Sequence, residues 1–271
     1  MPGAPTLGRT RVAVCTDVHA NLPALRAALA AIDRLGVDAI YHTGDLIGIG
    51  PYPAECVDVL LERADVRCVM GNHDAWFAFG LPEPRPPWMS EAEWQHQQWV
   101  HAQLDPAVRP VVAAWPYALA VQVGGVDVEL MHYALAEGGR RFRAIRPLAS
   151  GADADALFER RGARLIFYGH HHRTSDLTGA TTRYVNPGSL GCDAEPLARF
   201  AILEARPRGA YHLTLHAVRY DPADVAAELE RRGVPAREFI RENFMPWAAP
   251  REPHRDGYDG DGPVDWLVRP P

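Results

Sequence analysis

The chain has 271 residues, of which 47% are hydrophobic and 23% are charged, and its formal net charge is −6 at pH 7. These values are close to the average of soluble globular proteins, and they exclude a disordered or fibrous chain. The mild acidity excludes a broad basic face, so we expect no bulk binding of nucleic acid.

The sequence also lacks the signals of a membrane or secreted protein. No run of about 18 apolar residues occurs, and Met1 to Thr10 has no basic region followed by an apolar stretch. The cysteines show neither C-x-x-C spacing nor the density of a secreted scaffold, which favours buried thiols in a reducing compartment. They are Cys15, Cys56, Cys68 and Cys192. We therefore expect a soluble cytoplasmic protein, and the oligomeric state stays open.

The N-terminal part alternates strand and helix patterns. Strands are expected at 11–15, 39–43 and 66–70, and helices at 22–35 and 53–63. Asn21 has the side chain of an N-cap for the first helix, and Gly36 is a stop signal. This βαβαβ run predicts parallel strands joined by right-handed crossovers.

The remainder is less regular. We expect a tryptophan-rich helical insertion at about 75–116, and Gly124-Gly125 indicates a hairpin turn. Further helices are expected at 90–104, 153–161 and 221–232, and further strands at 118–123, 126–131, 164–168, 182–185, 199–204 and 210–219. The second half thus leans antiparallel, and 246–271 has the composition of a loosely held tail.

These elements predict an α/β (α+β) protein in which two mixed sheets pack face to face between helices. The expected fold is a four-layer αββα double-sheet sandwich with a helical insertion. We expect a core domain at residues 1–220, followed by a C-terminal helix and tail at 221–271.

Polar clusters follow the predicted strands at five places. They are Asp17-Val18-His19, Gly44-Asp45, Gly71-Asn72-His73-Asp74, His132 and Gly169-His170-His171-His172. Ligands of parallel sheets gather beyond the carboxyl ends of the strands, and residues i and i+2 of an extended segment point the same way. Carboxylate and imidazole ligands without thiolate favour manganese, iron or zinc over calcium. The clusters therefore predict a two-metal site, which suits hydrolysis of phosphate esters, with Asp45 placed to bridge the ions.

These clusters carry a resemblance to a known family. The chain resembles the calcineurin-like metallophosphoesterases, in particular their small bacterial and archaeal phosphodiesterase branch, over about residues 11–220. The matching motifs are DVHAN (17–21), GDLIGIGPYP (44–53), GNHD (71–74), MHY (131–133), GHHH (169–172) and NPGSLG (186–191). Several motifs in this order, each after a predicted strand, are a specific signal.

The resemblance implies roles for individual residues. It implies that Asp17, His19 and His172 hold a first metal, that Asp45 bridges, and that Asn72, His132 and His170 hold a second. It implies that His73 contacts the phosphate and can protonate the leaving oxygen or stabilise the charged transition state. Residues expected beside the ligands or the substrate are Asn21, Asp74, Tyr133, His171 and Asn186.

The chain departs from the family at three places. Leu46 to Gly50 replaces the Asp-Arg pair of the protein-phosphatase branch, which removes the arginine that would hold a monoester dianion. Tyr133 stands where relatives often have glycine, so we expect narrower access. His171 replaces a small residue, and we expect it to touch substrate or face solvent.

The predicted function is a binuclear phosphodiesterase in which a metal-bridging hydroxide attacks a small phosphate ester in line, with Asp45 and His73 as catalytic residues. The expected cofactors are two divalent ions, manganese or iron, with zinc as an alternative. Two other functions stay open: a phosphomonoesterase acting on nucleotides or phosphoproteins, and a non-catalytic metal-binding interaction scaffold. We expect the tryptophans of 75–116 to serve packing. The remaining histidines receive no role: His42, His96, His101, His212, His216 and His254.

Overall fold

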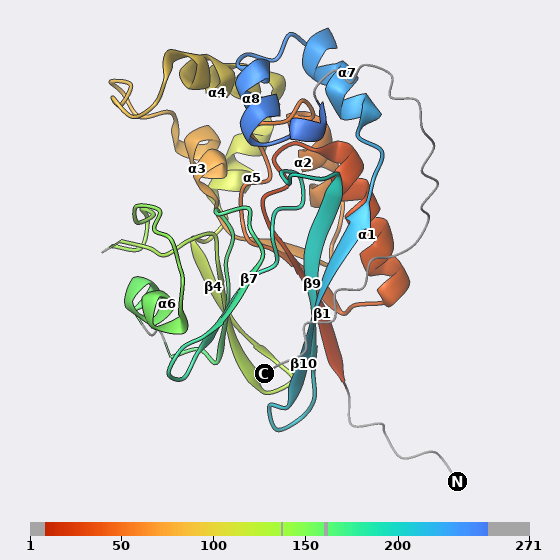
Figure 1. Ribbon diagram of the computed structural model, residues 1–271, viewed down its shortest axis with the longest axis vertical. Helices are drawn as coiled ribbons and strands as arrows, with labels where there is room; N and C mark the ends of the chain where they lie inside the picture. Colours follow the sequence, from red (N-terminus) through yellow and green to blue (C-terminus); the bar gives the residue numbers. More distant parts are fainter. Residues whose placement is uncertain (1–8, 137, 160–161, 249–271) are drawn as a thin grey trace.

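The first of two five-stranded sheets contains the predicted parallel unit. The computed structural model describes residues 9–136, 138–159 and 162–248, and Figure 1 shows their arrangement. The order of this sheet is β10-β9-β1-β2-β3. Its strands are β1 (Thr10–Cys15), β2 (Ala39–His42), β3 (Val66–Cys68), β9 (Leu197–Ala205) and β10 (Tyr211–Arg219). Strands β1, β2 and β3 are parallel, which confirms the βαβαβ prediction, and β9 is antiparallel to both β1 and β10.

The second sheet has the order β4-β5-β6-β8-β7. Its strands are β4 (Ala118–Val123), β5 (Val126–Met131), β6 (Leu165–Phe167), β7 (Ser175–Thr178) and β8 (Arg183–Asn186). The predicted hairpin of β4 and β5 is confirmed. The expected antiparallel bias of the second half holds for the pairs β4–β5 and β7–β8 but not for the centre of this sheet, because β5, β6 and β8 are parallel. Helix α6 (Gly151–Phe158) provides the crossover from β5 to β6, and the short strand β7 was not predicted.

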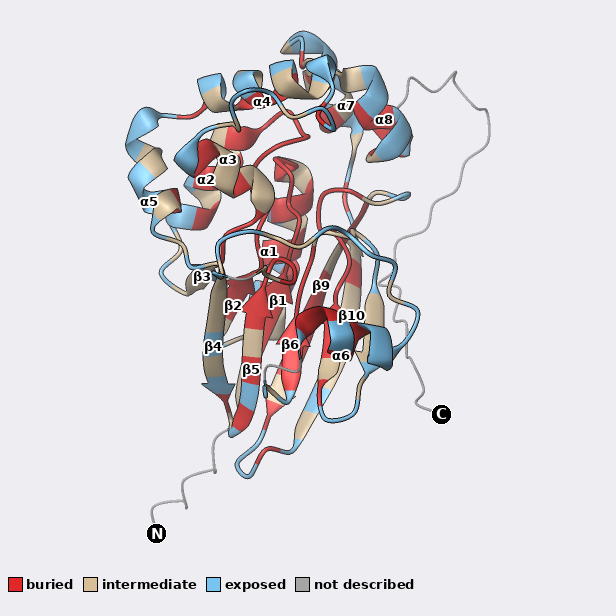
Figure 2. Ribbon diagram, turned by 90° about the vertical axis from the view of Figure 1, so that its left-hand side faces the viewer, coloured by how far each residue is buried: buried red, intermediate tan, exposed pale blue. Residues whose placement is uncertain are grey.

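Helices cover the outer faces of both sheets, which confirms the four-layer αββα sandwich. Helices α1 (Leu22–Leu35), α2 (Pro53–Leu61) and α7 (Ala223–Arg231) share one apolar core with the first sheet. Helix α6 packs on the second sheet. A third core, with Val14, Val128 and Phe167, fills the space between the sheets. Figure 2 shows the buried residues concentrated on the strands and on the inner sides of the helices.

A helical segment connects β3 to β4. It contains α3 (Asn72–Phe79), α4 (Glu91–Gln103), the 3-10 helix η1 (Pro106–Val108) and α5 (Arg109–Ala113). The predicted helix at 90–104 is confirmed as α4, with the Ser90 side chain accepting a hydrogen bond from the Glu93 N–H. Helix α3 was not predicted. Asn72 and His73 lie in its first turn and not in a simple turn. In Figure 1 these helices lie beyond one end of the strands.

The C-terminal part adds two elements that the sequence did not indicate, α8 (Arg237–Asn243) and the 3-10 helix η2 (Pro246–Ala248). Trp247 is buried and donates from Nε1 to the Asp193 carbonyl at 3.1 Å. The rest of the expected tail, 249–271, lies outside the described residues, as does His254. No helix within the described ranges has the length and apolar character to span a membrane. The cysteines are free thiols, and only Cys68 is partly exposed.

Candidate metal centre

The predicted metal ligands lie on backbone of unusual conformation. Of the seven, five have φ angles in the left-handed region: Asp17 (53°), His19 (47°), Asp45 (58°), His170 (71°) and His172 (56°). Such angles are uncommon for residues other than glycine and cost free energy, so they cluster at functional sites. The expectation that Asp17 and His19 extend along a strand is therefore wrong. A tight turn, and not strand alternation, directs both side chains inward.

Backbone hydrogen bonds join the loops that carry these ligands. The N–H groups of Asp17 and His19 donate to the carbonyls of Gly44 and Asp45, each at 3.0 Å. The Asp17 carbonyl accepts from the Ser189 hydroxyl at 2.7 Å. The loops after β1, β2 and β8 thus hold one another in place.

Two glycines allow the loops after β2 and β3 to touch. A Cβ atom on Gly71 would lie 2.1 Å from the Asp45 nitrogen, and one on Gly44 would lie 2.7 Å from the Gly71 Cα. No side chain fits between these backbones. This close approach brings Asp45 next to Asn72.

One set of donor atoms comes from Asp17, His19 and His172. The Asp17 Oδ1 lies 3.6 Å from the His19 Nε2 and 3.7 Å from the His172 Nε2, and the two imidazole nitrogens are 2.8 Å apart. Ligand atoms that bind one ion at about 2.1 Å lie about 3.0–3.4 Å from one another. The spacing therefore fits a single cation. Cys192, which was not predicted, has its sulfur within 4.8 Å of the His19 and His172 nitrogens.

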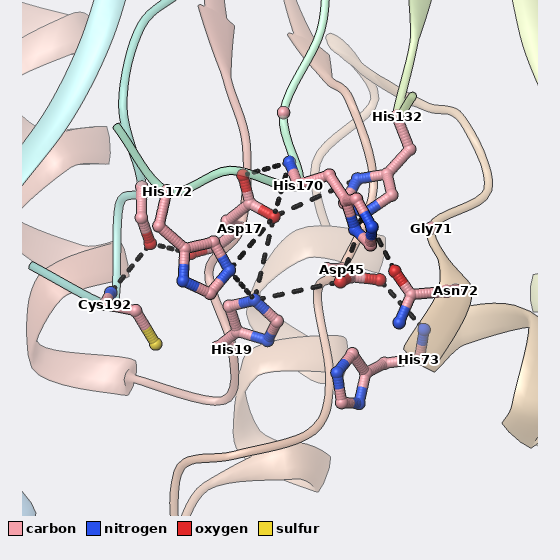
Figure 3. Close-up of polar contacts among 12 residues, drawn as sticks. Asp17, His19, Asp45, Gly71, Asn72, His73, His132, His170, His172 and Cys192 are labelled. Atoms are coloured by element: carbon pink, nitrogen blue, oxygen red, sulfur yellow. Dashed lines mark hydrogen bonds and ion pairs between the residues drawn. The ribbon is translucent and has the colours of Figure 1, made fainter. Parts of the chain in front are cut away.

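A second set is centred on His132 (Figure 3). Its Nε2 lies 3.2 Å from the Asp45 Oδ2, 3.1 Å from the Asn72 Oδ1 and 3.0 Å from the His170 Nδ1. The His132 Nδ1 lies 3.0 Å from the Thr43 carbonyl and donates to it, which directs the Nε2 at the other donor atoms. Burial lowers the pKa of His132, but Asp45 raises it to about 9, so a bound metal would displace the Nε2 proton.

Asp45 connects the two sets, because its Oδ2 also lies 3.8 Å from the His19 Nε2. We call these seven residues the donor cluster: Asp17, His19, Asp45, Asn72, His132, His170 and His172. The structure brings all seven together, as the sequence analysis expected.

The charges of the donor cluster suit a bound cation. Burial would raise the pKa values of Asp17 and Asp45, but the surrounding histidines hold both well below the usual range, so both are anionic. Burial lowers the pKa of His170 to about 3 and of His172 to about 4, which keeps their lone pairs available. Buried carboxylates need compensating positive charge. Carboxylate, imidazole and amide donors match manganese, iron or zinc.

His73 lies at the edge of the donor cluster (Figure 3). Its backbone N–H donates to the Asp45 Oδ1 at 2.9 Å. The Gln97 side chain contacts its Nδ1 through both the amide nitrogen (3.1 Å) and the amide oxygen (3.4 Å), so the position of the ring proton follows the orientation of that amide. Burial lowers the pKa of His73 to about 3, so the ring is neutral.

Two residues of α4 contribute to the site without having been predicted to do so. Gln97 contacts His73, and nothing in the sequence distinguishes it from the exposed Gln98 beside it. His96, which received no role, accepts from the Ile49 N–H at 2.9 Å and donates to the Pro235 carbonyl at 3.1 Å. It thereby ties the loop after β2 to the C-terminal part.

Asp74 organises the loop that carries Asp45. Its carboxylate accepts from the N–H groups of Asp45 (2.8 Å), Leu46 (3.1 Å), Ile47 (3.4 Å) and Gly71 (3.0 Å). It therefore orients a neighbouring loop and caps α3. Burial and the charge of Asp45 raise its pKa to about 7.

Asn21 and Asn186 support loops, and their hydrogen bonds go to groups outside the donor cluster. The Asn21 Oδ1 accepts from the Ala24 N–H at 3.2 Å, which confirms the predicted N-cap, and its Nδ2 donates to the Gly191 carbonyl at 2.9 Å. Asn186 donates to the Gly169 carbonyl at 3.0 Å. Both residues connect the NPGSLG loop to its neighbours.

Tyr133 and His171 both pack against His170 of the donor cluster. Tyr133 is fully buried, its ring centroid lies 5.0 Å from that of His170, and its hydroxyl accepts from the Arg146 N–H. Tyr133 has no exposed surface and packs on a predicted metal ligand, and the expectation that it narrows access stays a prediction. The His171 ring packs against Tyr133 and Tyr168 and stays outside the donor cluster.

Known proteins share both the sequence pattern and this fold. A sequence model of the calcineurin-like phosphoesterase superfamily domain matches residues 10–207. The fold is similar to a metallophosphoesterase of Sphaerobacter thermophilus, with 26% identity, a TM-score of 0.65 and coverage of 86% of this chain and 97% of that one. It is also similar to a hypothetical protein of Pyrococcus horikoshii OT3, with 18% identity, a TM-score of 0.73 and coverage of 87% and 98%.

A curated relative matches a shorter part. An uncharacterized protein of Methanocaldococcus jannaschii is 41% identical over 68 residues, which are 24% of this chain. The match spans 27% of the length of that relative.

Proposed function

The chain belongs to the calcineurin-like phosphoesterase superfamily, a family of metal-dependent hydrolases of phosphate esters, and on this premise we propose that it is a binuclear phosphodiesterase. The observation that carries the proposal is the position of Asp45. Its Oδ2 lies within 3.8 Å of His19 and within 3.2 Å of His132, so one carboxylate can serve two ions.

The donor cluster divides between two cations. Asp17, His19 and His172 would hold one ion, Asn72, His132 and His170 the other, and Asp45 would bridge them. Two bound divalent ions, manganese or iron with zinc as an alternative, supply Lewis acidity and acidify a water for in-line attack.

His73 serves the leaving group in this proposal. With the Gln97 amide nitrogen donating to Nδ1, the neutral ring would carry its proton on Nε2, the nitrogen that does not contact Gln97. A positioned N–H of this kind can donate a hydrogen bond to the departing oxygen and stabilise the charge that develops there, which typically contributes about 10²–10³-fold in rate. The hydrogen bond from the His73 backbone to Asp45 keeps the ring beside the donor cluster.

The surroundings of the donor cluster favour a diester over a monoester. The loop after Asp45 is apolar and buried at Leu46, Ile47 and Ile49. Within residues 9–136, 138–159 and 162–248, no arginine makes a hydrogen bond or ion pair with the donor atoms. A monoester dianion gains most from an arginine fork, whereas a diester carries one charge less and depends less on it.

We extend the proposal to the partner and the compartment. The substrate is a small phosphate ester, since the buried donor cluster offers no broad basic surface. The free thiols of the four cysteines support a reducing cytoplasm.

The test combines metal analysis with a panel of phosphate monoesters and diesters. We expect two ions per chain, faster hydrolysis of diesters, and loss of turnover with a chelator that manganese restores. Faster hydrolysis of monoesters would favour a phosphomonoesterase. Two bound ions without turnover on any ester would favour an interaction scaffold.

A further inference from the structure

An aromatic pair extends from His73 to the protein surface. The Trp76 ring of α3 meets the His73 ring edge to face, with centroids 4.9 Å apart. Trp88, in the loop between α3 and α4, stacks on Trp76 with centroids 6.3 Å apart and an interplanar angle of 27°. Trp88 is 65% exposed. Two indole rings thus lead from His73 to solvent.

Packing accounts for other tryptophans of this segment but not for Trp88. Trp99 stacks on the buried His96, and Trp115 packs against the core that α1 and α2 share with the first sheet. Trp88 leaves most of its indole in water, where apolar surface is unfavourable. The expectation that the tryptophans serve packing therefore does not explain it.

We propose that Trp76 and Trp88 form a binding subsite for a flat aromatic ring, a nucleobase or an aryl group, on the leaving alcohol of the diester. The inference rests on the proposed function. Because His73 donates to the leaving oxygen, the group attached to that oxygen departs on the side of His73. Trp76 contacts His73 on this side.

Stacking explains which ring the subsite accepts. Every nucleobase has a π-face, so stacking on indole tolerates different bases and gives about a 10- to 100-fold gain in binding. The charged side chains Arg85 and Glu91 beside the loop pair with each other at 3.4 Å. The subsite therefore selects for flatness rather than for charge.

The test compares two diesters whose leaving alcohols have similar size and acidity, benzyl methyl phosphate and cyclohexylmethyl methyl phosphate. We expect the wild type to favour the benzyl ester about 10-fold or more in kcat/KM. Trp88→Ala should remove this preference and leave the cyclohexylmethyl rate within about twofold, because the exposed side chain contributes little to folding. The control is Phe239→Ala, an exposed aromatic residue of α8, whose neighbour Phe244 contacts His172 rather than His73.

A binding measurement separates this inference from the proposed function. Calorimetry with AMP and with ribose 5-phosphate reports the contribution of the base even in a protein that hydrolyses no ester. We expect AMP to bind about 10-fold more tightly to the wild type and equally to Trp88→Ala. Equal binding of both ligands to the wild type, or a preference that survives Trp88→Ala or disappears in Phe239→Ala, would overturn the subsite. Absent hydrolysis with this binding pattern would overturn only the proposed activity.

Discussion

The two flanks of the candidate metal centre are built in different ways. On the sandwich flank, loops after the strands place the donor cluster through their backbone, with left-handed φ angles at residues such as Asp17 and Asp45. On the helical flank, α3 and α4 reach the site through side chains, chiefly Trp76, His96 and Gln97.

This difference suggests that the sandwich flank determines whether the ester is hydrolysed, whereas the helical flank determines which leaving group is preferred. Five of the seven predicted metal ligands lie on strained backbone, and hydrogen bonds between the loops hold that backbone in place. A substitution in these loops therefore displaces the donor atoms. A side-chain contact can be exchanged without moving the loops. We therefore expect changes on the sandwich flank to lower turnover of every substrate, and changes on the helical flank to alter the response to the leaving group.

The largest effect is expected for Asp45→Asn, which keeps the shape of the side chain but removes the charge between the two sets of donor atoms. Turnover should fall by about three orders of magnitude or more for every ester, and bound metal should fall below two ions per chain. Steady-state rates and metal analysis measure both effects. Asp33→Asn, at an exposed ion pair with Arg63, is the control and should behave as the wild type. Wild-type turnover in Asp45→Asn would remove the bridging role.

A smaller effect is expected for Gly48→Ala, which tests how tightly the loop after β2 is fitted to His73. The new Cβ would lie 2.3 Å from the His73 Nδ1, so the ring must move, and kcat should fall by about 10- to 100-fold. Gly80→Ala is a matched control, because Gly80 has a similar φ of 94° and nothing within 4 Å. Both variants should lose about 1 kcal/mol of stability from backbone strain. Equal kcat values would show that the contact with His73 does not matter.

The helical flank is tested by Gln97→Leu, which removes the hydrogen bond to the His73 Nδ1. A hydrogen bond to the leaving oxygen matters most when that oxygen is basic, so alkyl diesters should lose about 10-fold in kcat while p-nitrophenyl diesters change little. The slope of a plot of log kcat against the pKa of the leaving alcohol, measured over a series of diesters, reports this effect. Gln98→Leu changes the exposed neighbour and should leave the series unchanged. An equal loss for all leaving groups would indicate a purely structural role for Gln97.

The same division explains what the sequence could predict. The donor cluster lies in short motifs at the ends of strands, where glycine and polar residues follow an apolar run. Asp17, Asp45 and His132 were therefore found from pattern and resemblance, together with the sandwich that carries them. The left-handed φ angles of Asp17 and Asp45 were not predicted. The Asp17-Val18-His19 segment, for example, contains no glycine that would indicate a turn.

The helical flank could not be predicted in this way. Gln97 lies 24 positions after His73, and their contact depends on how α4 packs over the strand ends. Helix α3 was missed because its eight residues are too few to show a clear helical pattern of apolar residues. Strand β7 was missed because only four residues form it. Contacts made by tertiary packing leave no local signal.

The smallest effect on activity is expected for His42→Leu. His42 lies at the end of β2 and is not part of the donor cluster or of α3 and α4. It is fully buried, both ring nitrogens lack a hydrogen-bond partner, and burial lowers its pKa to about 4. The folded protein keeps His42 neutral while the unfolded chain binds a proton below about pH 6.5, so this histidine removes stability as the pH falls from about 6.5 to about 4, by up to about 3 kcal/mol. His42→Leu should leave turnover unchanged, keep or slightly raise stability at pH 7.5 because no orphan nitrogen remains, and weaken the acid dependence. Urea unfolding of the metal-free protein at pH 7.5 and 5 measures this, with the exposed His212→Leu as control. A pH dependence equal to that of the wild type would show that His42 does not stay neutral in the fold.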